Sequence, residues 1–293
     1  MSWLQAHITI DPARVPLIEL LFEQLGAVAV SLHDAADEPM LEPAPGETPL
    51  WQANRVTGLF TGDTDADALR IAITQTLSDE IGDGLRLERL GDRDWERAWL
   101  DRFRPMRFGR RLWIRPSGHA VEQPDAVVVD LDPGLAFGTG THPTTALCLR
   151  WLDAHDLDGR DVIDFGCGSG ILAIAALKLG ARHAIGIDHD PQALLATRDN
   201  ALRNSVANAL DVEHSEQSGG AAADIVIANI LANVLIRLAP KIAGLLRPGA
   251  QLVMSGILQH QADEVMRAYA EQIEFEPTET DEDWVLLSGR RRT

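Results

Sequence analysis

The chain has 293 residues, of which 45% are hydrophobic, and 26 basic side chains face 44 acidic ones, giving a formal net charge of −18 at pH 7. This length favours two unequal domains, and the negative charge argues against stable binding to nucleic-acid phosphates. No apolar run approaches the roughly 18 residues that cross a bilayer, and the first residues lack the basic and apolar blocks of a signal peptide, so we expect a cytoplasmic protein that does not bind membranes.

Residues 1–91 predict a small α+β domain. Strands with alternating apolar residues flank one helix, and an acidic, proline-rich loop at 34–49 separates them from a further strand, helix and strand. The order β-α-β-β-α-β is that of a ferredoxin-like split βαβ fold. The expected strands are 3–10, 27–33, 51–60 and 85–90, and the expected helices are 12–25 and 66–77.

Charge is distributed unevenly along the chain. Residues 1–90 hold 15 acidic and 5 basic side chains, whereas residues 102–115 hold six arginines and no acid. Such blocks usually form solvated faces that keep a protein soluble. A more specific interpretation is that the acidic front domain attracts a basic macromolecule by electrostatic steering.

Residues 92–125 predict a linker helix followed by a connecting segment. Trp95, Trp99 and Phe103 recur at four-residue spacing, which places them on one face of a helix. An aromatic stripe of this kind more often packs against a neighbouring domain than binds a ligand. We expect one short strand in the connecting segment, at 110–116.

From residue 126 to residue 293, apolar strand segments alternate with helical segments. This alternation predicts a parallel sheet with helices on both faces, as in Rossmann-like α/β domains. Two last apolar runs, at 273–276 and 284–287, are expected to add an antiparallel edge to the sheet. The other expected strands are 162–166, 184–188, 224–230 and 251–257, and the expected helices are 171–179, 191–204, 234–246 and 261–270.

A glycine-rich turn connects the strand at 162–166 to the next helix. Gly166, Gly168 and Gly170 stand at alternate positions. Glycine permits positive φ and lets a ligand approach the backbone, because it has no Cβ. The helix that follows exposes N–H groups at the carboxyl edge of the sheet, where open α/β folds bind ligands. The turn is therefore a candidate cofactor site.

The spacing separates this turn from the one in nicotinamide-dependent dehydrogenases. Their dinucleotide pattern, counted from Gly166, requires glycine at the position of Ile171. Asp164 is a second difference, because a carboxylate beside a diphosphate would be repulsive. The same carboxylate suits the cationic amino group of an amino-acid moiety.

Polar residues also end the next two strands of the expected sheet. Asp188 stands where a carboxylate can accept hydrogen bonds from both hydroxyls of an adenosine ribose, provided that it lies at the same sheet edge as Gly168. Its alternative role is to cap the following helix, but Asp190, directly before Pro191, is the better N-cap. Asn229 either orients a polar ligand or caps its own helix, and the sequence favours neither.

A loop rich in glycine and threonine leads into a helix that begins near Pro143. Its glycines suit a flexible lid, while Thr144 and Thr145 offer hydroxyls and helix N–H groups to an anionic carboxylate. His142 is a candidate general base. The candidate lid glycines are Gly134, Gly138 and Gly140.

Taken together, these segments resemble class I methyltransferases and, more closely, the PrmA family, which methylates the large-subunit ribosomal protein L11. The resemblance covers nearly the whole chain. It implies S-adenosylmethionine as the cofactor, a front domain that recognises the basic ribosomal protein, and methyl transfer to the N-terminal α-amine and to lysine ε-amines. The segments are DPGLAFGTGTHPTT at 132–145, DFGCGSGILAIAALKLGA at 164–181, GIDHDPQA at 186–193 and ANILANVL at 228–235.

The resemblance also implies which residues contact the cofactor. By motif they would be Thr145, Gly166, Asp188 and Asn229, beside Asp164, Gly168 and Gly170 of the same turn. Asn229 would also orient the donor or the acceptor. His142 is not required as a base, because in-line transfer from a sulfonium mainly needs a neutral nucleophile, alignment and exclusion of water.

Neither a metal nor a permanent oligomer is expected. The two cysteines, Cys148 and Cys167, have no Cys or His nearby at metal-ligand spacing.

Two alternative functions remain open. One is methylation of another acceptor, such as a release-factor glutamine or a nucleic acid, although NILA after position 228 lacks the Pro-Pro-aromatic run of those enzymes. The other is a silent donor-binding module that assists ribosome assembly, which the intact motifs disfavour.

Overall fold

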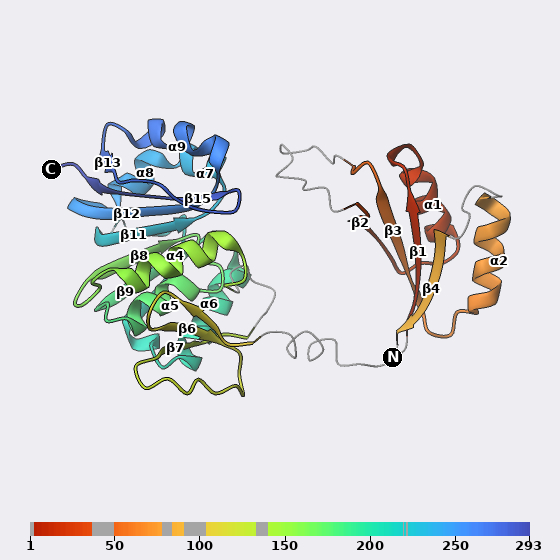
Figure 1. Cartoon of the computed structure of the whole chain (residues 1–293), viewed down its shortest axis with the longest axis horizontal. Coiled ribbons are helices and arrows are strands. Elements are labelled where there is room, and N and C mark those ends of the chain that lie inside the picture. Colours follow the sequence, from red (N-terminus) through yellow and green to blue (C-terminus); the bar gives the residue numbers. More distant parts are fainter. Residues whose placement is uncertain are drawn as a thin grey trace. The chain divides into compact units, whose positions relative to one another are not determined.

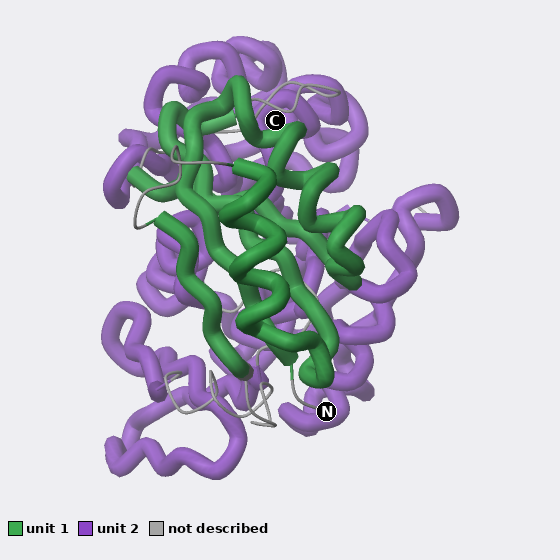
Figure 2. Tube along the Cα trace, turned by 90° about the vertical axis from the view of Figure 1, so that its right-hand side faces the viewer, with its two compact units in different colours: residues 1–98 green, residues 99–293 purple. Residues whose placement is uncertain are grey.

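The computed structural model describes residues 3–36, 50–77, 84–90, 104–132, 140–218, 220 and 222–293. The chain divides into two compact units, Met1–Ala98 and Trp99–Thr293 (Figure 2). No helix in the described part of the chain is long and apolar enough to span a membrane. Five residues named above lie outside the described residues: Trp95, Trp99, Phe103, Gly134 and Gly138.

The first unit is an antiparallel sheet with two helices against one face (Figure 1). Its elements are β1 (Trp3–Ile10), η1 (Pro12–Arg14), α1 (Val15–Gln24), β2 (Ala29–Asp34), β3 (Asn54–Thr61), α2 (Ala66–Leu77) and β4 (Leu85–Leu90). The strand order is β2-β3-β1-β4. Leu4 and Ile8 point inward from β1 and pack with Phe22 of α1, Phe60 of β3 and Ile73 of α2, because side chains alternate between the two faces of a strand.

The second unit begins with a small three-stranded sheet. Its strands are β5 (Met106–Phe108), β6 (Leu112–Arg115) and β7 (Val127–Asp130). Asp153 is only 7% exposed. Its carboxylate accepts hydrogen bonds from the backbone N–H groups of Arg110, of Arg111 at 3.1 Å and of Leu112 at 3.0 Å. These bonds fix the turn between β5 and β6. The sequence predicted only β6, since β5 and β7 span three and four residues and carry little periodicity.

The main sheet has eight strands in the order β10-β9-β8-β11-β12-β15-β13, with β14 paired to β15. The strands are β8 (Asp161–Phe165), β9 (His183–Asp188), β10 (Leu210–His214), β11 (Ala223–Asn229), β12 (Leu246–Leu258), β13 (Ile273–Phe275), β14 (Glu279–Asp281) and β15 (Trp284–Arg291). Strands β8 to β12 run parallel, and β15 pairs antiparallel with both β12 and β13. The expected parallel sheet with an antiparallel edge is therefore confirmed.

Helices cover both faces of this sheet (Figure 1). They are α4 (Pro143–Ala154), α5 (Ile171–Lys178), α6 (Pro191–Arg203), α7 (Ala232–Arg237), α8 (Ala239–Gly244) and α9 (Ala262–Tyr269), with single turns η4 (Ala207–Ala209) and η5 (Gln259–Gln261). Val162 and Ile227 belong to the core with α4, α5 and α6, whereas their neighbours Ile163 and Val226 belong to the core with α7, α8 and α9. This alternation makes a three-layer α/β domain.

The structure corrects one expected helix and adds strands. The helix expected at 234–246 is two helices that meet at Leu238. Pro240 lies in the first turn of α8, and because proline has no N–H and clashes with the preceding turn, one continuous helix cannot run through it. Strands β10 and β14 were not predicted. The segment of β10, LDVEH, has only two apolar residues, as suits a charged strand at the sheet edge.

Candidate functional site

The candidate site lies where the order of strands reverses direction. From β8 the chain proceeds to β9 and β10 on one side, and then continues from β11 to β12 on the other. In register, Phe165 pairs with Ile187 and Asp164 pairs with Ile227. The glycine turn after β8 is therefore flanked by the carboxyl ends of β9 and β11. Ligands of open α/β folds bind at such a switch point.

The three alternate glycines all require the freedom that glycine gives. Gly166, Gly168 and Gly170 have φ of 81°, 55° and 78°, in the left-handed region that other residues rarely adopt. The N–H of Gly166 donates to the Ile187 carbonyl at 2.7 Å, and Gly170 donates to Cys167 at 2.7 Å. The turn is thus anchored to β9 and closed by its own backbone, directly before α5.

Asp188 lies at the same sheet edge as Gly168, as the sequence interpretation required. The N–H of Gly168 donates to Oδ2 of Asp188 at 3.0 Å. Oδ1 accepts from the N–H groups of His189 at 2.7 Å and Asp190 at 3.0 Å. Asp190, not Asp188, caps α6 by accepting from Gln192 at 2.9 Å, which confirms the expected N-cap. Asp188 is therefore not needed as the helix cap.

Asp164 is a buried carboxylate with an unsatisfied oxygen. It is 1% exposed; Oδ2 accepts from the N–H of Ala173 at 3.1 Å, and Oδ1 has no hydrogen-bond partner. Burial, with a smaller contribution from the charge of Asp188, raises the pKa of Asp164 to about 7, although the bond from Ala173 lowers it. A buried acceptor without a donor is costly. Such an oxygen fits a site that receives a cationic amino group.

Thr145 and Asn229 are brought together from distant parts of the sequence. The amide of Asn229, at the end of β11, donates to the hydroxyl of Thr145 in the first turn of α4 at 3.2 Å. Thr145 is 1% exposed. The capping alternative for Asn229 is wrong, because the N-cap of α7 is Leu231 and makes no side-chain bond. Asn229 therefore bonds Thr145 at the sheet edge instead of capping a helix.

His142 is the N-cap of α4. Its Nδ1 accepts from the N–H of Thr144 at 3.3 Å and lies 2.8 Å from the Thr144 hydroxyl. The ring packs edge-on against Trp284, with centroids 4.9 Å apart. Burial lowers the pKa of His142, opposed by the charge of Glu282, so the imidazole is neutral at pH 7. These contacts give His142 a structural role that needs no catalysis.

Two residues of α6 that the sequence motifs do not single out also hold the glycine turn. Thr197 and Asn200 of α6 donate to the carbonyls of Gly168 and Ser169, at 3.0 and 2.9 Å. No local pattern signals them, because both side chains find their acceptors only where the glycine turn packs against α6. Among the described residues there is no cluster of His, Cys, Asp or Glu that could hold a metal, and Cys148 and Cys167 are buried free thiols.

Comparisons with known proteins cover the whole chain. The family described as "Ribosomal protein L11 methyltransferase (PrmA)" matches residues 2–292. A curated protein of that name from Hahella chejuensis is 55% identical over 291 residues, 99% of each chain, and one from Azotobacter vinelandii is 53% identical over 100% of each. A crystal structure of ribosomal protein L11 methylase from Lactobacillus delbrueckii subsp. bulgaricus is 30% identical, has a TM-score of 0.60, and covers 65% of this chain and 100% of its own.

Proposed function

Because the chain belongs to the PrmA family of ribosomal protein L11 methyltransferases, we propose that it transfers methyl groups from S-adenosylmethionine to amines of ribosomal protein L11. The observation that carries the proposal is the joint geometry of Gly168 and Asp188 beside the buried, unsatisfied oxygen of Asp164. A glycine turn, a carboxylate on the neighbouring strand and an acceptor for a cation suit the backbone, ribose and amino group of a sulfonium nucleoside.

The donor supplies an electrophilic methyl group on a sulfonium. Asp188 would accept hydrogen bonds from the ribose hydroxyls, and its own backbone bonds keep the carboxylate in place for this task. Asp164 would hold the amino group, and Thr145 with Asn229 would orient the donor or the incoming amine at the end of β11. Gly166, Gly168 and Gly170 let the donor approach the main chain.

The acceptor amines are the N-terminal α-amine and lysine ε-amines of L11. A lysine has a pKa near 10.4 in water and must lose its proton before it attacks. Desolvation or neighbouring positive charge lowers that pKa. His142, whose Nδ1 is held at Thr144, is not assigned as the base.

Residues 1–91 bind the substrate, 92–125 link the domains, and 126–293 carry the donor site. The first unit fits this role because residues 1–90 hold 15 acidic and 5 basic side chains, which attract a basic ribosomal protein. The enzyme works as a monomer in the cytoplasm, where ribosomal proteins are available, and it does not bind nucleic acid or membranes stably.

A turnover assay tests the proposal. The purified chain is incubated with S-adenosylmethionine carrying a labelled methyl group and with purified ribosomal proteins, and the products are analysed by mass spectrometry. Label on amines of L11 alone supports the proposal. Label on another protein or on RNA identifies a different acceptor, whereas donor binding without any transfer identifies a silent module. Intact L11 from cells with and without the gene gives the number and positions of the methyl groups.

A further inference from the structure

Helix α6 and its C-cap residue carry three polar side chains on the face that the helix buries. Thr197, Asn200 and Asn204 are 0%, 8% and 3% exposed. Positions three and four apart share one face of a helix, so the three form a row along α6. The row does not face solvent. Each member is instead bonded to the backbone of another segment.

Thr197 is fitted to the glycine turn in two ways. Its hydroxyl donates to the carbonyl of Gly168 at 3.0 Å and lies 3.4 Å from the thiol of Cys167. Its methyl group occupies the space beside Gly170, where an added Cβ would come within 2.7 Å. The side chain therefore bonds one residue of the turn and packs against another.

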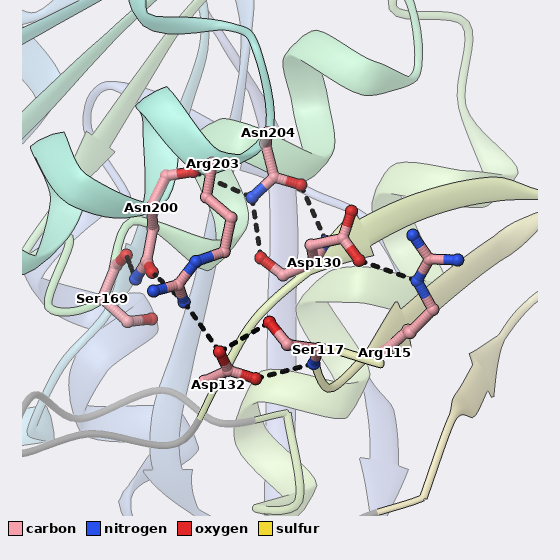
Figure 3. A network of polar contacts seen from close by, with 8 residues as sticks. All are labelled: Arg115, Ser117, Asp130, Asp132, Ser169, Asn200, Arg203 and Asn204. Carbon is pink, nitrogen blue, oxygen red and sulfur yellow. Dashed lines mark hydrogen bonds and ion pairs between the residues drawn. The ribbon is translucent and has the colours of Figure 1, made fainter. Parts of the chain in front are cut away.

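Asn200 and Asn204 continue the row (Figure 3). The amide of Asn200 donates to the Ser169 carbonyl at 2.9 Å. Asn204 bonds both backbone groups of Asp130, accepting from its N–H and donating to its carbonyl, each at 2.7 Å. Thr197 and Asn200 thus hold the glycine turn, whereas Asn204 holds the end of β7.

Gly168 is held from both sides. Its N–H donates to Asp188 at 3.0 Å, and its carbonyl accepts from Thr197 at 3.0 Å. Glycine has the largest range of backbone conformations, so a turn with three glycines needs external bonds to keep one of them. Loss of the Thr197 bond would free the peptide between Gly168 and Ser169, and the N–H that meets Asp188 would no longer be fixed.

We propose that Thr197 and Asn200 are positioning residues of the donor site, which fix the Gly168 and Ser169 carbonyls and thereby hold the turn against the Asp188 carboxylate. This inference rests on the proposed function, because it assigns the turn and Asp188 to donor binding. Neither side chain is a catalytic residue. They act through the backbone that they hold.

The test compares Thr197→Val, which keeps the shape of threonine but removes the hydroxyl, with Thr197→Ser, which keeps the hydroxyl. The Kd of S-adenosylhomocysteine is measured by calorimetry, and the KM values of S-adenosylmethionine and L11 are measured separately. Thr197→Val is expected to raise the Kd and the donor KM about five- to tenfold, as loss of one buried hydrogen bond implies, and to leave the KM of L11 unchanged. Thr197→Ser should stay within about twofold of wild type.

Asn204→Leu is the matched control, since it removes buried bonds to the backbone of Asp130 and of Asn200 but none to the turn. It should lower the melting temperature while the donor Kd stays within about twofold. Asn200→Ala is measured in the same way, and it carries the test alone if Thr197→Val does not fold. The inference is overturned if the Thr197→Val and Asn200→Ala Kd values match wild type, if Thr197→Ser is as weak as Thr197→Val, or if Asn204→Leu weakens the donor equally. A wild-type chain that binds no S-adenosylhomocysteine would overturn the proposed function itself.

Discussion

Replacing Asp164 by asparagine should make the donor-free protein more stable at alkaline pH and impair donor binding. The carboxylate is 1% exposed, and one of its oxygens lacks a partner. Burial and the nearby charge of Asp188 raise the pKa of Asp164 to about 7 from its ordinary value of 3.8. Asparagine keeps the size and the acceptor for the Ala173 N–H but never ionises.

The sign and size of the effect follow from proton linkage. Between pH 3.8 and about 7 the folded protein binds the proton that the unfolded chain has lost, so the free energy of unfolding falls as pH rises through this window. The stabilisation is fully present below pH 3.8 and is lost above about pH 7. At about 1.4 kcal/mol per pKa unit, a shift of about three units sets a ceiling of about 4 kcal/mol, of which about 2 to 3 kcal/mol falls between pH 5 and pH 8.

Urea denaturation of both full-length proteins without donor measures this difference. The wild type should lose about 2 to 3 kcal/mol relative to Asp164→Asn when the pH is raised from 5 to 8, since the other titrating groups are common to both proteins. Parallel curves of stability against pH for the two proteins would refute the reasoning, because they would mean that the Asp164 carboxyl ionises as it does in the unfolded chain.

The same substitution, which should stabilise the donor-free protein at alkaline pH, should weaken donor binding. The ionised carboxylate attracts the amino group of the donor, so Asp164→Asn should weaken binding of S-adenosylhomocysteine by about 1.5 to 3 kcal/mol. For the wild type, affinity should fall as pH drops below about 7, where Asp164 takes up a proton. Calorimetry at pH 6 and pH 8 measures both effects. Equal affinities of wild type and variant at pH 8 would remove Asp164 from the donor site.

Asp188→Ala should weaken S-adenosylhomocysteine binding by about 1.5 to 3 kcal/mol in calorimetry through loss of charge-assisted hydrogen bonds, and unchanged affinity would exclude it from the site. Gly166→Ala should lower the free energy of unfolding in urea by about 2 to 4 kcal/mol, because φ is 81° and the new Cβ would come within 2.3 Å of the Ile230 side chain. The control Gly159→Ala, at φ 67° with open space around the new Cβ, should lower it by only about 1 kcal/mol. Equal losses would argue against the clash with Ile230. Deleting residues 1–90 should preserve donor binding and abolish methylation of L11 in a turnover assay; normal methylation would show that this domain was misassigned.

The meeting of Gly168 and Asp188 could be predicted because both residues stand at fixed positions relative to strand ends. Gly168 and Asp188 each follow a buried strand, and parallel strands bring their carboxyl ends to one edge. The pairing of Thr145 with Asn229 was expected only as membership of one site, not as a direct hydrogen bond. It joins residues 84 positions apart, and no local pattern encodes such a contact.

Other features could not be predicted because they depend on tertiary contacts. Asp153 looks like an ordinary acid near the end of a helix, yet its carboxylate anchors the turn between β5 and β6. Thr197 reads as a weak helix former within α6, and only the approach of the glycine turn gives its hydroxyl an acceptor. The break at Leu238, in contrast, is predictable from the sequence. Pro240 lies within the helix expected at 234–246, and a proline at that position prevents one continuous helix.

The same contrast explains why the acceptor is harder to derive than the donor. The glycine turn of the proposed donor site needs one residue type at one position, such as glycine at 166, where an added Cβ would meet Ile230. Attraction of a basic protein needs only an excess of acid, and the 15 acidic residues within 1–90 would supply it in many different orders. Single substitutions among those acids should therefore change the association rate slightly and additively, whereas a single substitution at Asp188 should act on the whole site.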